Sequence, residues 1–193
     1  IAATPFSHGF ISAIKSQCHM PFYYLYLKFF MTFFGQSDLV LRLTSAFAGI
    51  LSIITMYFVG KEHDERTGIF CAGFSAISSF LIYYSQEVRF YSVLFLFSAL
   101  SLLFIIKCIK HPNKQNFILC TIFNFLILFT HTIGFVFVFF NLVCLSLILY
   151  KQFRKAIITI WATLIGLGLV LSPLVLKILT SQTFSQWWGH FSV

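Results

Sequence analysis

The chain has 193 residues, of which 59% are hydrophobic and only 9% are charged, and its formal net charge is +8. A soluble domain is typically about one quarter charged, so this composition cannot cover a water-exposed surface. The composition excludes a soluble domain and predicts an all-α integral membrane protein.

The N-terminal part, residues 1–38, is predicted to be an external loop with juxtamembrane helices. Its apolar stretch from Pro21 to Phe34 is too short to cross a bilayer and carries Lys28 near its middle. An aromatic helix lying in the membrane interface fits this pattern. The alternative is a short true crossing, which would invert the sidedness of every loop that follows.

A bundle of about six transmembrane helices is predicted over residues 39–178, because a helix needs about 20 residues to cross the hydrocarbon core. The fourth and fifth crossings are separated only by a short break at Thr130–Gly134. Residues 179–193 are predicted to begin a further external segment. The expected crossings are 39–60, 68–84, 90–109, 116–131, 133–150 and 156–178.

Most basic residues lie in three polar breaks between these crossings, namely Lys61 and Arg66, then Lys107, Lys110 and Lys114, then Lys151, Arg154 and Lys155. Bases confined to short membrane loops mark the cytoplasmic side. They therefore argue against a nucleic-acid partner, despite the net charge. The five cysteines are scattered, with no spacing typical of a zinc site or a disulfide framework.

The sharpest polar cluster is the segment 83–91, YYSQEVRFY, at the external tip of a predicted helical hairpin. Arg89 offers a planar set of donors to a phosphate, and Glu87 offers a carboxylate to a sugar hydroxyl or a divalent ion. The alternative is that Glu87 and Arg89 only cap and solvate the hairpin.

Three more residues are candidates at the same external level. His131 lies between two apolar crossings and is suited to bind a metal or an anion, or simply to form a structural hydrogen bond at a helix end. His19 stands just before Met20-Pro21, where a proline fixes the start of a helix. Arg42 lies within an apolar run and could pair with Asp38 four residues earlier.

Several segments together resemble the GT-C class of membrane glycosyltransferases, in the branch of dolichyl-phosphate-mannose protein mannosyltransferases and bacterial lipid A sugar transferases. The resemblance covers nearly the whole chain. The matching segments are HMPFYY at 19–24, FGQS at 34–37, LRLTSA at 41–46, IYYSQEVRFY at 82–91 and TH at 130–131.

The resemblance implies an enzyme that moves a sugar from a polyprenyl-phosphate carrier to a lipid, protein or glycan acceptor. It implies an outward-facing site in a bacterial cytoplasmic membrane. Glu87 and Arg89 become the catalytic candidates, and His19, Arg42, Tyr84, Tyr91 and His131 the substrate-binding ones. A divalent metal is expected as the only candidate cofactor, with Glu87 and His131 as its candidate ligands.

Two departures from the family pattern stand out. The family usually has His-Pro-Pro where this chain has His19-Met20-Pro21. The expected general base, an acidic residue of the first external loop, has no counterpart in residues 1–18. We therefore expect this base and one further crossing to lie upstream, and this fragment alone to be inactive.

Two other functions fit the same features. A transporter subunit would also place ionisable residues in a membrane protein, but usually near the midplane. A non-catalytic relative that binds a lipid-linked sugar would keep the polar cluster and lack the base.

Overall fold

The computed structural model describes residues 21–131 and 133–179, which form seven α-helices and no strand. The predicted all-α class is therefore confirmed. Predictions for residues 1–20 and 180–193, including His19, lie outside the described residues. The helices are α2 (Pro21–Phe34), α3 (Asp38–Lys61), α4 (Glu65–Ile77), α5 (Ser79–Gln86), α6 (Tyr91–Lys110), α7 (Lys114–Thr130) and α8 (Gly134–Leu179).

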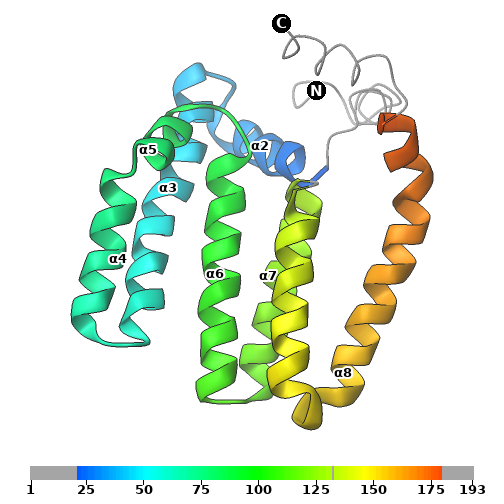
Figure 1. Ribbon diagram of the computed structural model, residues 1–193. Coiled ribbons are helices and arrows are strands. Elements are labelled where there is room, and N and C mark those ends of the chain that lie inside the picture. Colours follow the sequence, from blue (N-terminus) through cyan, green and yellow to red (C-terminus); the bar gives the residue numbers. More distant parts are fainter. Residues whose placement is uncertain (1–20, 132, 180–193) are drawn as a thin grey trace, which may run out of the picture.

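Helix α2 has the bounds predicted for the interfacial helix. It lies across one end of the bundle, and it contacts α3 and α7 (Figure 1). Its Tyr23 and Leu27 side chains are buried, whereas Phe29 and Phe33 are exposed. The helix ends at Phe34, and the next residue, Gly35, has a φ of 90°, which glycine adopts far more readily than other residues. The position of this helix in the membrane interface stays a prediction.

Three helices of the described chain are long and apolar enough to cross a membrane: α3, α6 and the first limb of α8, Gly134–Lys151. Together α4 and α5 make a fourth candidate, as a broken span. Helix α7 is apolar but has only 17 residues. The structure is therefore that of a multi-pass membrane protein.

The predicted crossing 68–84 is broken at Ser78, where α4 and α5 meet at an angle of 56°. Ser78 has an extended conformation, with φ −63° and ψ 114°, and its hydroxyl accepts a hydrogen bond from the Leu81 amide at 3.5 Å. A serine side chain that caps a new helix competes with continuation of the old one. The sequence periodicity of the apolar run did not reveal this break.

The last two predicted crossings form the two limbs of α8. The limbs meet at Phe153, whose φ of −120° and ψ of 28° are not helical. The Trp161 Nε1–H donates to the Ser146 hydroxyl at 2.9 Å and so ties one limb to the other. The break predicted after Thr130 is confirmed, because α7 ends at Thr130 and α8 begins at Gly134.

A core of apolar side chains joins α6, α7 and the first limb of α8, including Ile105, Ile127 and Leu145. Polar groups also meet inside it. The Ser101 hydroxyl donates to Asn124 Oδ1 at 3.0 Å, and the Asn141 amide donates to the same oxygen at 3.1 Å. Hydrogen bonds of this kind hold helices together in an apolar solvent.

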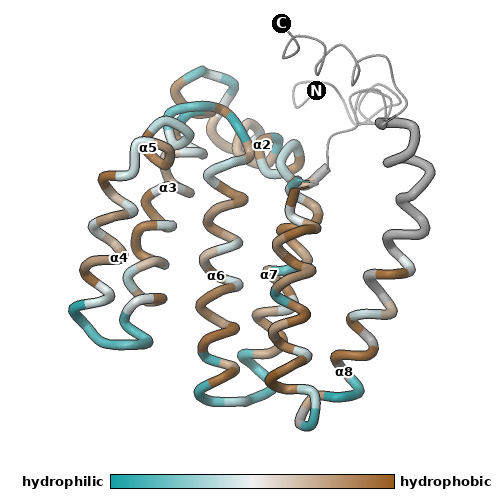
Figure 2. The backbone as a smooth tube through the Cα atoms, in the orientation of Figure 1, coloured by the Kyte–Doolittle hydropathy of each residue, from teal (hydrophilic) through white to brown (hydrophobic). Residues whose placement is uncertain are grey.

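The basic loops gather at one end of the bundle, as predicted. The α3–α4 connection, the α6–α7 connection and the bend of α8 all lie at the lower end in Figure 1, and the hydrophilic colours of Figure 2 mark the same places. Glu62 joins two of them, with its carboxylate 4.0 Å from Lys107 Nζ and 3.9 Å from Lys110 Nζ. The α5–α6 and α7–α8 connections lie at the opposite end.

Candidate functional site

The candidate site centres on the connection between α5 and α6, here called the α5–α6 turn (residues 86–90). Helix α5 ends at Gln86, and Glu87 is extended, with φ −96° and ψ 145°. The Arg89 amide then donates to the Glu87 carbonyl at 2.9 Å, which folds the chain back before α6 begins. The turn is therefore ordered by its own backbone and presents Glu87 and Arg89 at the end of the bundle away from the basic loops.

Glu87 and Arg89 form an ion pair, with 3.1 Å between Arg89 Nε and Glu87 Oε2. The Arg89 side chain is 60% exposed and the Glu87 side chain 29%. The Tyr83 hydroxyl is a further hydrogen-bond partner of Glu87. An exposed pair like this contributes at most about 1 kcal/mol to stability, so its stabilising effect does not explain the cluster.

Aromatic rings surround the turn. The Tyr84 and Tyr91 rings have centroids 4.3 Å apart, and the Phe90 and Tyr91 rings 4.2 Å. The Ser92 hydroxyl donates to the Tyr84 carbonyl at 2.8 Å, which joins the start of α6 to the last turn of α5. The two tyrosines predicted to bind substrate therefore lie together beside the Glu87–Arg89 pair.

His131 lies at the same end, as predicted, and its ring stacks on Phe90 with centroids 4.1 Å apart and an interplanar angle of 16°. Its Nδ1 accepts a hydrogen bond from the Ile133 amide at 3.1 Å. In a neutral imidazole the proton is therefore on Nε2. His131 thus has the structural hydrogen bond considered as an alternative, and it also contacts the residue next to Arg89.

Arg42 reaches the turn from α3. Its Nη1 donates to the Gln86 carbonyl at 3.1 Å, 44 residues further along the chain. The ion pairs of the described residues do not include the predicted pair of Arg42 with Asp38. Arg42 and His131 are both brought to the α5–α6 turn, whereas the substrate contacts predicted for them stay predictions.

The predicted divalent metal has no ready-made centre among residues 21–131 and 133–179, where no group of three His, Cys, Asp or Glu side chains could hold an ion. Glu87 is already paired with Arg89. The described residues therefore do not form a metal site by themselves, and the metal ligands stay a prediction.

Sequence reasoning missed the residues that support the site. Tyr23 of α2 meets the Phe90 ring edge-on, with centroids 6.3 Å apart, so α2 also contacts the turn. The Gln86 carbonyl and the Ser92 hydroxyl also have supporting roles. Gln86 and Phe90 lie within the segment 82–91, but nothing in that segment indicated that they contact Arg42, Tyr23 and His131.

The fold and the site together define a multi-pass, all-α membrane protein whose acidic, basic and aromatic residues converge at one end of the bundle. The family model described as dolichyl-phosphate-mannose-protein mannosyltransferase matches residues 18–178, and the chain belongs to this family. The match spans every candidate residue from His19 to His131. No curated protein and no solved structure matches the chain significantly. The predicted resemblance to GT-C membrane glycosyltransferases that use polyprenyl-phosphate sugars is thus confirmed.

Proposed function

We propose that this protein transfers a sugar from a polyprenyl-phosphate carrier to a lipid, protein or glycan acceptor, at the end of the bundle that carries the α5–α6 turn. The observation that carries the proposal is the partly exposed Glu87–Arg89 pair at that end, flanked by Tyr84 and Tyr91. The reaction class is inferred from the family, and the α5–α6 turn has residues suited to this reaction.

The outward orientation is proposed on the charge of the loops. Positively charged loops stay in the cytoplasm, and the three basic connections lie opposite the α5–α6 turn. The turn then faces away from the cytoplasm, in the cytoplasmic membrane of a bacterium. A carrier lipid in that outer leaflet places its phosphate at the level of the turn.

The proposed chemistry is a direct displacement at the anomeric carbon. A base takes the proton of the acceptor hydroxyl, the acceptor oxygen bonds to the anomeric carbon, and the bond from that carbon to the phosphate oxygen breaks. The carrier phosphate leaves with the bonding electrons, so its charge changes from one negative charge to two. The residues that hold this phosphate must therefore bind it more strongly in the transition state than in the ground state.

Arg89 is proposed to hold the departing phosphate. Its guanidinium carries five N–H donors, and the contact with Glu87 involves Nε. Donors therefore remain for phosphate oxygens, and the exposure of 60% leaves them accessible. Glu87 is proposed to contact a sugar hydroxyl while it keeps Arg89 in place. The base is proposed to be the acidic residue that the family pattern has in its first external loop.

The proposal is tested with the full-length protein in membranes, supplied with a panel of radiolabelled polyprenyl-phosphate sugars. We expect transfer of label to a membrane or polymer product by the parent and loss of this transfer in Arg89→Ala at matched protein levels. Binding of a carrier sugar without turnover by the parent would indicate a non-catalytic binding protein instead. Movement of an intact solute across sealed vesicles would indicate a transporter.

A further inference from the structure

The C-terminal end of α5 depends on other helices for its hydrogen bonds. The last four carbonyls of a helix have no partner within that helix, and cations near this end are favourable. Helix α5 has no basic residue in its last turn. Two of its terminal carbonyls receive donors from outside: Tyr84 from Ser92 of α6 at 2.8 Å, and Gln86 from Arg42 of α3 at 3.1 Å.

We propose that Arg42 is a positioning residue, which fixes the Glu87–Arg89 pair through the Gln86 carbonyl. This inference rests on the proposed function for its effect on sugar transfer. The peptide unit is planar, so the direction of the Gln86 carbonyl also sets the direction of the Glu87 amide. By holding this one oxygen, Arg42 fixes the point at which the chain leaves α5 and enters the turn.

A second contact between α3 and α5 shows that the two helices meet along a defined line. A Cβ placed on Gly49 would lie 2.9 Å from Ser85 Cβ, closer than side-chain atoms ordinarily approach. Gly49 follows Arg42 by seven residues, so both lie on one face of α3. The face of α3 on which Gly49 allows α5 to approach therefore also carries Arg42, whose guanidinium contacts the C-terminal end of α5.

The other end of the turn is held differently. Phe90 lies between the ring of His131, with centroids 4.1 Å apart, and the ring of Tyr23, at 6.3 Å. The turn is thus held by a charged hydrogen bond at residue 86 and by ring contacts at residue 90. Glu87 and Arg89 lie between these two supports. Loss of the Arg42 contact frees the end of the turn that is next to Glu87.

A positioning role and a substrate-binding role for Arg42 make different predictions. A residue that binds the donor phosphate directly raises the KM for the donor when it is removed, and it leaves the empty protein unchanged. A positioning residue changes the turn even without substrate, and it then lowers kcat because the reacting groups are misplaced.

The test uses the full-length protein in nanodiscs and measures hydrogen–deuterium exchange of the peptide covering residues 86–90 without substrate. We expect Arg42→Ala to speed exchange there by about tenfold, because local opening of the turn becomes easier. Arg42→Lys keeps a cationic donor and is expected to restore slow exchange in part. The control is Arg66→Ala, the same change at an exposed arginine of the opposite end, which should leave the turn unchanged.

The same variants are then assayed for transfer. We expect Arg42→Ala to lower kcat by up to about 100-fold with a change of less than about threefold in the donor KM. Unchanged exchange of residues 86–90 in Arg42→Ala would overturn the positioning role, and a raised KM alone would assign Arg42 to the substrate. If Arg42→Ala does not fold, Arg42→Gln, which keeps a hydrogen-bond donor without the charge, is measured in its place. Absence of transfer by the parent would overturn the proposed function, while the exchange data would still decide the role of Arg42.

Discussion

Arg89 is held by Glu87 but remains largely in contact with solvent, which is an arrangement suited to a group that exchanges partners. The pair at 3.1 Å limits the positions of the guanidinium without burying it. A buried pair would have to pay a desolvation cost that an anionic ligand would then need to overcome. In the partly exposed pair, Glu87 orients the Arg89 guanidinium while an anionic ligand can still reach it.

Two substitutions of Arg89 separate charge from geometry. Removal of one preorganised donor to a charge that develops in the transition state typically costs about 100- to 1,000-fold in rate. We expect Arg89→Ala to lose transfer to this extent, and Arg89→Lys to keep part of it, because lysine retains the charge but lacks the planar set of donors. Initial rates with a polyprenyl-phosphate sugar measure both.

Arg66→Lys serves as the control for this series, since Arg66 is exposed at the opposite end. Membrane insertion should be unchanged in all these variants, because one residue at a helix tip adds little to the cost of crossing. Transfer by Arg89→Ala at near the parental rate would show that Arg89 is only a solvated residue of the hairpin.

Asp64 caps α4 at the basic end, and its hydrogen bonds set its response to pH. The Thr67 amide and hydroxyl both donate to its carboxylate, at 2.9 and 2.7 Å, and His63 lies at 2.6 Å. These contacts, with the Thr67 amide first, hold the pKa of Asp64 well below its usual range. A lowered pKa in the folded protein means that the cap stabilises above the unfolded pKa, near 3.9, and weakens as the pH falls below it.

We therefore expect the Thr67 amide to stay protected from hydrogen exchange at pH 5 and to lose protection only as the pH falls well below 4. Asp64→Asn keeps an oxygen acceptor without the charge and should remove the pH dependence. Equal loss of protection at acid pH in Asp64→Asn and the parent would show that another group titrates.

Helices α3 and α4 approach each other closely because glycines lie at their contact. A Cβ on Gly60 would lie 2.6 Å from the Thr67 carbonyl oxygen, and one on Gly68 would lie 2.9 Å from the Tyr57 carbonyl oxygen. These neighbours are backbone atoms, which cannot move away from an added Cβ as the end of a flexible side chain can. Close approach at small residues is a common way to pack helices in lipid.

Gly60→Ala is therefore expected to destabilise the hairpin by about 1–3 kcal/mol through overpacking. Gly73 of α4 provides the matched control, because a Cβ there meets nothing within 4 Å. Alanine is the better helix former, so Gly73→Ala should be neutral or stabilising. Unfolding in mixed detergent micelles compares the two, and equal destabilisation by both would contradict the close approach.

The break between α4 and α5 at Ser78 separates the helix that packs along α3 from the short helix that leads into the α5–α6 turn. Helices α4 and α5 meet at an angle of 56°, and both contact α3. Arg42 and Gly49 of α3 contact α5 beyond this bend. Ser78 is the N-cap of α5, the helix that leads into the α5–α6 turn.

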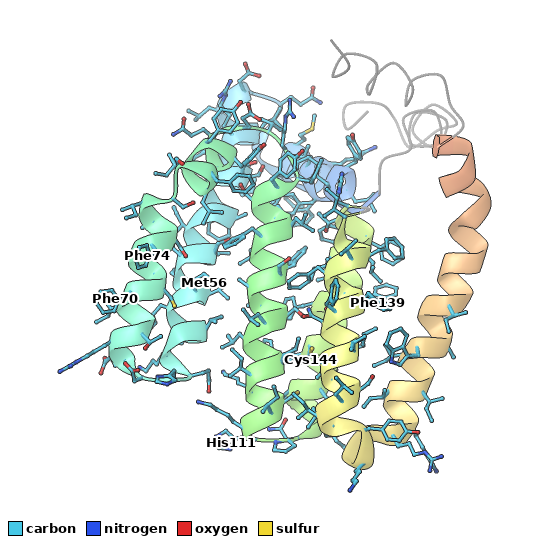
Figure 3. All side chains as sticks on the ribbon, viewed as in Figure 1. Met56, Phe70, Phe74, His111, Phe139 and Cys144 are labelled. Carbon is cyan, nitrogen blue, oxygen red and sulfur yellow. The ribbon has the colours of Figure 1, made fainter. Side chains whose placement is uncertain are left out.

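The whole molecule separates a basic end from the end that carries the candidate site. His111, labelled at the lower end of Figure 3, belongs to the α6–α7 connection there, and Phe70 and Phe74 of α4, also labelled, are exposed. Many large apolar side chains are exposed in this way, among them Phe74 at 71% and Leu147 at 81%. Apolar exposure of this extent fits a protein whose solvent is the bilayer.

A labelling experiment tests the sidedness. Single cysteines at Gln86 and at Lys114, in the full-length protein lacking its native cysteines, are treated with a membrane-impermeant maleimide on intact cells. We expect Gln86→Cys to react from outside and Lys114→Cys to react only after lysis, because basic loops stay in the cytoplasm. Gln86 keeps its backbone carbonyl in this variant, so the contact with Arg42 is retained. The opposite pattern would reverse the topology and place the site in the cytoplasm.

The membrane class, the bounds of the helix 21–34, the break after Thr130 and the clustering of the basic loops could all be predicted from the amino-acid sequence. These properties depend on local composition, because a bilayer requires a fixed length of apolar helix and attracts basic residues to one side. Glu87 and Arg89 lie two residues apart in the segment 82–91, so both could be chosen as candidate site residues without a structure.

The contacts that Arg42, Tyr23 and His131 make near the α5–α6 turn could not be predicted from the sequence. Tyr23 comes from α2, Arg42 from α3 and His131 from the residue that follows α7, so these contacts depend on how the helices pack. The bend at Ser78 was equally invisible, since a serine in an apolar run fits a continuous helix as well as a broken one. Local pattern determines where a helix begins and what it faces, whereas the partner of a terminal carbonyl depends on which helix packs beside it.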